Sequence, residues 1–147
     1  MTVRLSGPPR RRGLPAIDKR LLRARAVHLL RAVEEARAEL SIALVDDAKI
    51  AELNAEYRGL DRATDVLSFS LREGKGADYS GSLLGDVVIG LETAARQARG
   101  RRRSVDDEVA RLLIHGTLHL LGHDHERGDE ARVMRAEERR LWRAINP

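Results

Sequence analysis

The sequence predicts one α+β domain, spanning residues 1–147, in which helices pack against a small mixed sheet. The length of 147 residues fits a single domain. A hydrophobic fraction of 42% beside 34% charged residues is enough to close a core, which excludes a disordered chain or a fibrous repeat. Segments with helical periodicity alternate with short segments of strand periodicity, and this order predicts helices packed on one sheet.

The first half of the chain contains two predicted helices and one strand. Apolar residues recur at helical spacing over residues 16–37, and His28 lies off this stripe, so we expect it to face solvent. Apolar and small or polar residues alternate over residues 40–44, which predicts a strand. A polar helix over residues 48–57 is expected to follow it.

The second half begins with two predicted strands, over residues 66–69 and 83–89. They are rich in β-branched or aromatic side chains, and the glycine-containing stretch 73–81 between them is typical of a mobile loop. The two strands are therefore expected to be neighbours in the sheet. Three further helices are predicted, over residues 91–99, 104–121 and 129–145.

The positive charge is concentrated near the beginning of the sequence. The formal net charge is +4, yet the first 37 residues hold ten Lys or Arg and only three acidic residues. Residues 1–15 are expected to form a flexible basic arm, which either docks RNA or remains a solvated extension. A second arginine cluster occupies residues 96–103. Four aromatic residues are too few for base-stacking platforms, so any RNA contact should be made mostly to phosphates.

The residue types and segments that the sequence lacks limit which metal ligands are available and where in the cell the protein is expected. The sequence has no cysteine, so any metal must be held by histidine and carboxylate side chains. Apolar stretches stay well short of a membrane span, and residues 1–12 have no apolar segment typical of a signal peptide. We therefore expect a cytoplasmic protein without a membrane partner.

Four of the five histidines lie in residues 115–125. His115 and His119 are four residues apart, so on a helix their imidazoles lie on one face and can bind the same ion. Gly122 can end that helix in the left-handed conformation, and the chain can then turn back to bring His125 to the ion. Three protein ligands leave one position for water, which predicts one catalytic zinc ion per chain with a bound water molecule.

Other roles for these polar residues remain open. The histidines could be hydrogen-bonded core residues, and His123 could be a fourth ligand, which would make a zinc site structural. Asp124 could either orient a ligand imidazole or be a solvated loop carboxylate. Asp65 and Asp86 lie in or beside strands and could orient water, although strand-end carboxylates are more often structural.

The three histidines have the spacing of the metal ligands in the metzincin proteases, whose motif is H-E-x-x-H-x-x-G-x-x-H on a zincin-like metal helix. One residue of the motif differs. Gly116 stands where those proteases have glutamate. That glutamate is the general base and acid of peptide hydrolysis. The metal ligands are therefore kept, whereas a zinc peptidase is disfavoured.

The sequence also resembles the YbeY family of endoribonucleases, through three blocks that span residue 53 to the C-terminus. Residues 115–125 match H-G-x-L-H-L-x-G-[YF]-D-H except at His123. Residues 57–69 match Y-R-x-x-D-x-x-T-D-V-L-S-F, with Ser70 in place of the proline that follows, and residues 84–89 match L-G-D-[IV]-V-I. The first 37 residues carry no motif of the family.

The resemblance implies a single-strand-specific, zinc-dependent endoribonuclease. Its role would be 3′-end maturation of 16S ribosomal RNA and ribosome quality control, with the ribosome or ribosomal proteins as partners. By the same resemblance His115, His119 and His125 are zinc ligands, and Arg58 faces the RNA. The oligomeric state is not indicated by the sequence.

Zinc chemistry is compatible with the missing glutamate. Zinc can polarise a phosphodiester oxygen and lower the pKa of bound water to about 7, and Arg58 could then stabilise the developing charge. Arg58 could instead interact with a helix C-terminus. The attacking group, zinc-bound water or the ribose 2′-hydroxyl, stays open. The alternative functions are a non-catalytic, zinc-containing ribosome-assembly factor and, less favoured, a zinc peptidase.

Overall fold

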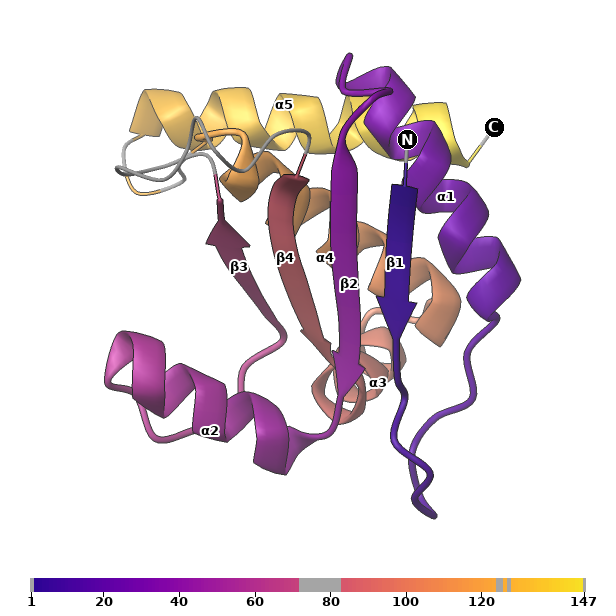
Figure 1. Ribbon diagram of the computed structural model, residues 1–147, viewed down its shortest axis with the longest axis vertical. Coiled ribbons are helices and arrows are strands. Elements are labelled where there is room, and N and C mark those ends of the chain that lie inside the picture. Colours follow the sequence, from indigo (N-terminus) through magenta and orange to yellow (C-terminus); the bar gives the residue numbers. More distant parts are fainter. Residues whose placement is uncertain (1, 72–82, 124–125, 127, 147) are drawn as a thin grey trace.

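The computed structural model describes residues 2–71, 83–123, 126 and 128–146, and it has the predicted α+β architecture (Figure 1). The predicted helices and strands are all present, although the first helix is shorter because Asp18 caps it and the chain leaves the helix at Val33. The elements are β1 (Thr2–Ser6), α1 (Lys19–Ala32), β2 (Glu39–Val45), α2 (Asp47–Arg58), β3 (Val66–Ser70), β4 (Leu83–Gly90), α3 (Leu91–Gly100), α4 (Val105–Leu120) and α5 (Gly128–Ile145).

The strands of the described residues form one mixed sheet in the order β1-β2-β4-β3. β1, β2 and β4 are parallel, and β3 pairs with β4 in the antiparallel sense. The predicted adjacency of β3 and β4 is therefore confirmed. The stretch 73–81, predicted to be a mobile loop, lies outside the described residues.

The prediction of a flexible basic arm over residues 1–15 is wrong for its first part. Thr2–Ser6 is the edge strand β1, in which Val3 pairs with Leu40 of β2 and is buried. Val3 and Leu5 alternate with more polar residues, which suits a strand with one covered face. Arg11, further along, forms an ion pair with Asp46 (2.9 Å between Nη1 and Oδ2). The short, charged β1 suits an exposed sheet edge.

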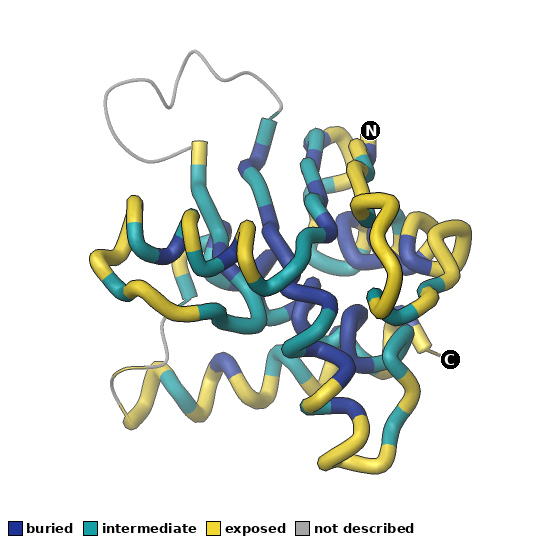
Figure 2. Tube along the Cα trace, turned by 90° about the horizontal axis from the view of Figure 1, so that it is seen from below, coloured by how far each residue is buried: buried dark blue, intermediate teal, exposed yellow. Residues whose placement is uncertain are grey.

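Helix α4 lies at the centre of the larger core. It contacts β3, β4, α1, α3 and α5, and Leu113, Ile114 and Leu118 on it are almost completely buried. Figure 1 shows it behind the sheet, and Figure 2 shows the buried segments gathered in the middle of the molecule. Because α4 is packed on several sides, the side chains that it presents to a cavity are held in fixed positions.

Helix α2 packs on the sheet through a smaller, separate cluster. Ile50 on α2 is buried with Leu67 of β3 and Val88 of β4, and Phe69 of β3 packs against them. This contact packs the first part of α2 against β3 and β4. None of the helices formed by the described residues combines the length and apolar character that a membrane span requires.

Candidate functional site

The ends of α4 are determined by local interactions that the sequence predicts. Ser104 caps its beginning by accepting a hydrogen bond from the backbone N–H of Asp107 (3.0 Å). At its end Gly122 has φ +92°, and its N–H donates to the carbonyl of His119 (3.0 Å). The N–H of His123 donates to the carbonyl of Leu118 (3.0 Å), which completes a Schellman motif. The glycine stop is therefore confirmed, and the chain turns directly after His119.

His115 and His119 lie on one face of α4, as predicted. Their Nε2 atoms are 3.1 Å apart, and the ring centroids are 4.7 Å apart at 73°. Two ligands of a tetrahedral zinc ion, each about 2.0–2.1 Å from the metal, are about 3.4 Å from each other. A hydrogen bond between the rings has a similar length. The pair therefore fits two ligands of one ion, and a third ligand distinguishes the two interpretations.

The predicted third ligand, His125, and its neighbour Asp124 lie outside the described residues. Within residues 2–71, 83–123, 126 and 128–146, no group of three or more histidine or carboxylate side chains is placed to hold a metal ion. The zinc site and the roles of its ligands therefore stay predictions. His123 lines the same cavity as His115 and His119.

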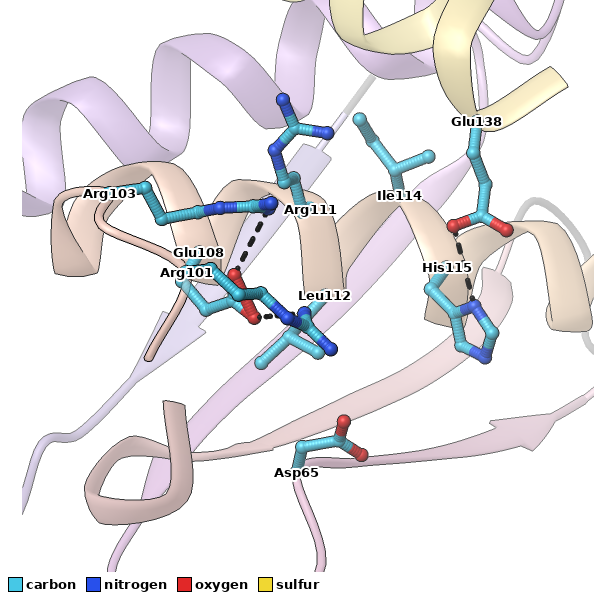
Figure 3. A pocket seen from close by; sticks show the side chains of 9 residues that line it. All are labelled: Asp65, Arg101, Arg103, Glu108, Arg111, Leu112, Ile114, His115 and Glu138. Atoms are coloured by element: carbon cyan, nitrogen blue, oxygen red, sulfur yellow. Dashed lines mark hydrogen bonds and ion pairs between the residues drawn. The ribbon is translucent and has the colours of Figure 1, made fainter. Parts of the chain in front are cut away.

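Glu138 on α5 is a site residue that the sequence reasoning missed. Its Oε2 lies 3.6 Å from Nδ1 of His115, and Figure 3 shows the carboxylate directed at the ring from α5. A carboxylate on the Nδ1 side favours a proton on that nitrogen and leaves Nε2 to face His119. The sequence gives no signal for this contact, because Glu138 is one of several charged residues on a solvent-facing helix.

The two histidines open onto a cavity of about 770 Å³. Arg58, at the end of α2, lines this cavity with them, and its contact with RNA stays a prediction. It is positioned by Gly59, which ends α2 with φ +70°, and by the contact of Tyr57 with Phe69 on β3 (4.8 Å between ring centroids). The cavity is lined by Tyr57, Arg58, Thr64, Asp65, Val66, Leu67, Ser68, Phe69, His115, His119, Gly122, His123 and Glu126.

The two aspartates considered from the sequence have different places. Asp65 lines the cavity, but its carboxylate accepts hydrogen bonds from the N–H of Val66 (2.8 Å) and from Nε2 of Gln97 (3.1 Å). These bonds tie the start of β3 to α3, which is a structural role. Asp86 lies within β4, opposite Phe69, and is not among the described residues that line the cavity.

Gly116 faces the sheet. A Cβ atom at this position would lie 2.9 Å from Oγ of Ser68 and 2.9 Å from Cγ1 of Val87. Ser68 also donates a hydrogen bond from Oγ to the carbonyl of Gly116 (2.8 Å), a contact that the sequence reasoning missed. The glutamate of a metzincin has no room here, so this position cannot supply the general base of a peptidase.

The chain is similar to proteins of one known family. The family model described as Endoribonuclease YbeY matches residues 15–146. The Endoribonuclease YbeY of Anaeromyxobacter sp. (strain Fw109-5) is 56% identical over 145 residues, which cover 98% of this chain and 72% of the relative. That of Anaeromyxobacter dehalogenans (strain 2CP-C) is 56% identical over 125 residues and 85% of this chain, which spans only 63% of the relative's length. That of Desulfitobacterium hafniense (strain Y51) is 50% identical over 121 residues, 78% of this chain and 76% of the relative.

A solved structure supports the fold. The solution structure of a Thermotoga maritima protein is 26% identical, with a TM-score of 0.66, and the match covers 97% of this chain and 88% of that one. The family match and the relatives lead to one conclusion. The chain belongs to the YbeY family of endoribonucleases.

Proposed function

We propose that this chain hydrolyses single-stranded RNA, with one zinc ion per chain held by His115, His119 and His125. The observation that carries the proposal is the cavity of about 770 Å³ that is lined both by Arg58 from α2 and by the paired imidazoles of α4. Guanidinium groups bind phosphate oxygens well because their planar fork can donate two hydrogen bonds.

Each residue has a distinct part in this proposal. Zinc, when bound, would polarise a phosphodiester oxygen and acidify a water molecule. Glu138, with Oε2 3.6 Å from Nδ1 of His115, would favour a proton on that nitrogen and leave the lone pair of Nε2 for the ion. Arg58 binds the non-bridging oxygens of the phosphate and balances the charge that develops there.

The walls of the cavity favour a single strand. Tyr57 is 60% exposed at the rim, and it packs against Phe69. Most RNA contacts are still expected at phosphates, but this one exposed ring, backed by a second ring, can stack on a single unpaired base, whereas bases inside a duplex are stacked on each other. Arg58, the next residue along the chain, is then placed to bind the phosphate of that nucleotide.

A peptidase is not supported by the packing of α4. The backbone at Gly116 lies against Ser68 and Val87, so no carboxylate can stand between the two histidines on the cavity side. Amide hydrolysis requires proton donation to a poor leaving group, for which that carboxylate serves in metzincins.

The finer role also belongs to this proposal. The resemblance described above implies 3′-end maturation of 16S ribosomal RNA and ribosome quality control in the cytoplasm, with ribosomal proteins as partners. Nuclease activity, the coarser part of this role, is supported by the three relatives reported above, each of which is named Endoribonuclease YbeY.

The proposal is tested by RNA cleavage with matched variants. The wild-type protein should cut a labelled single-stranded RNA, leave a duplex of the same sequence intact, and stop when a chelator is added. Arg58→Ala and His115→Ala should each lower the rate at least about a hundredfold, since the first removes the group that binds the reacting phosphate and the second removes a zinc ligand. Arg62→Ala and His28→Ala remove an exposed residue of the same type elsewhere and should keep the wild-type rate.

Two outcomes contradict the proposal. If all variants cleave equally, the activity is a contaminant. If the wild-type protein binds ribosomal RNA but cleaves none, and loses its fold when the metal is removed, the chain is the non-catalytic assembly factor instead.

A further inference from the structure

A second cavity, of about 350 Å³, is also lined by His115 (Figure 3). It shares His115 and Asp65 with the cavity described above, so the two hollows meet at the candidate active site. Its far end is lined by Arg101, Arg103 and Arg111, and we call this end the arginine pocket. These arginines include part of the cluster over residues 96–103, for which the proposed function has no role.

The arginine pocket is held together by one buried carboxylate. The side chain of Glu108 is 0% exposed, and its two oxygens contact different arginines: Oε2 is 2.9 Å from Nη1 of Arg101, and Oε1 is 3.2 Å from Nη1 of Arg103. Figure 3 shows both guanidinium groups directed at Glu108. Each arginine uses one nitrogen on the carboxylate, so other N–H groups remain to bind an anion. The contact fixes the two side chains before any ligand arrives.

Arg111 adds a third positive charge to the pocket lining. Its guanidinium lies over the ring of Trp142, 4.1 Å from the centroid, and its buried Nε has no hydrogen-bond partner among the described residues. Burial, and then the charge of Arg103, lower the pKa of Arg111 below its ordinary value. An anion in the pocket would offset this repulsion.

The positions along α4 connect the pocket to the histidines. Glu108, Arg111 and His115 are spaced at i, i+3 and i+7, so they lie on one face of the helix, with His119 one turn further. Seven residues of helix span about 10 Å. A chain that carries a negative charge at every unit can therefore lie along this face with one phosphate at the histidines and another at the arginines.

We propose that the arginine pocket is a second phosphate subsite, which binds the RNA backbone beside the bond that is cut. The proposal takes its ligand from the proposed function. The cavity also holds Asp65 and Glu138, but Asp65 is engaged by Val66 and Gln97, and Glu138 lies beside His115. At the arginine end Glu108 is the carboxylate in the lining, and the guanidinium donors that it leaves over suit a phosphate better than a neutral ligand.

The subsite is tested with a matched pair of variants in the full-length protein. Arg101→Gln removes a pocket arginine that is 55% exposed, while Arg103 still contacts Glu108. Arg99→Gln removes the same charge two residues away, outside the pocket lining. Binding of a fluorescent 12-nucleotide single-stranded RNA is measured by anisotropy at several salt concentrations, and the RNA is checked on a gel after each titration.

We expect Arg101→Gln to weaken binding about three- to tenfold and to reduce the slope of log affinity against log salt by about 0.7, as one lost phosphate contact requires. Arg99→Gln should change the affinity and the salt slope by less than half as much as Arg101→Gln does. If the two variants bind alike, the subsite is wrong. If the two variants differ in binding as expected but the wild-type protein cuts no RNA, the proposed cleavage is wrong and the phosphate subsite is still supported.

A measurement on the wild-type protein removes any dependence on the folding of the variants. Phenylglyoxal modifies accessible guanidinium groups, and mass spectrometry reports the modified residues. The same RNA should protect Arg101 at least about threefold relative to Arg99, because a bound phosphate blocks the donors of the guanidinium. Equal protection of the two arginines overturns the subsite.

Discussion

Replacing Gly116 with alanine tests whether the α4 helix is held in place by its close contact with β3 and β4. The new Cβ would lie 2.9 Å from Oγ of Ser68, 2.9 Å from Cγ1 of Val87 and 3.2 Å from Cγ2 of Val66. Ser68 cannot rotate away without losing its hydrogen bond to the carbonyl of residue 116 (2.8 Å). Val87 is completely buried in the core, so it has no space to move into.

The size of the effect follows from two opposing contributions. Forcing an extra methyl group into a tight contact costs about 1–3 kcal/mol, and the packing here favours the upper part of that range. Alanine is favoured over glycine within a helix by about 1 kcal/mol, which offsets part of this cost. The net loss of stability should be about 1–2 kcal/mol, which lowers Tm by roughly 2–8 °C for a chain of this size.

Gly100→Ala is the matched control. Gly100 ends α3, and an added Cβ would meet nothing within 4 Å, so this change should leave Tm unchanged or raise it slightly. Both variants are melted by differential scanning calorimetry, and RNA cleavage is measured at 25 °C. The Gly116 variant should also lose activity, because the helix must shift away from β3 and carry both histidines with it. A Gly116→Ala protein as stable as the wild type would refute the packing argument.

Two further predictions concern neighbouring residues of α5. Glu138→Gln should weaken zinc binding about tenfold in a competition titration with a chelator, since the carboxylate holds the His115 ring, whereas unchanged affinity would exclude that role. Glu137→Gln should not change zinc affinity, but it should lower Tm at pH 7. The hydrogen bond from Arg140 lowers the pKa of Glu137, so its contribution to stability is present above the ordinary carboxyl pKa and is lost as the pH falls through the lowered pKa of the folded state. A Tm difference that persists unchanged in strong acid would contradict this.

The helices and the inner strands could be predicted because their signals are local. Ser104 caps α4, Gly122 ends it, and the alternation of Leu40, Ile42 and Leu44 matches β2. The cap at Asp18 is also local, but the expected start of the first helix at residue 16 misses it. Each of these depends on residues only a few positions apart. The pairing of His115 and His119 belongs to the same class, because helical spacing alone brings the rings together.

Contacts between distant parts of the chain could not be predicted. The strand β1 is five residues long and lies near many arginines, and only its pairing with β2 makes it a strand. Glu138 reaches His115 because α5 crosses α4, and the role of Gly116 depends on β3 lying beneath it. For Arg101 and Arg103 the sequence indicates only a cluster of positive charge. Their arrangement around the buried Glu108 could not be predicted, because Glu108 lies on the next helix.

The central claim, that one ion held by the α4 histidines makes this chain a nuclease, is tested most directly by measuring metal content and RNA cleavage in the same samples. The account predicts about one zinc ion per chain and RNA cleavage in the wild-type protein and in His28→Ala, and neither in His119→Ala. A His119→Ala protein that retains full zinc content, or that cuts RNA at the wild-type rate, would contradict it.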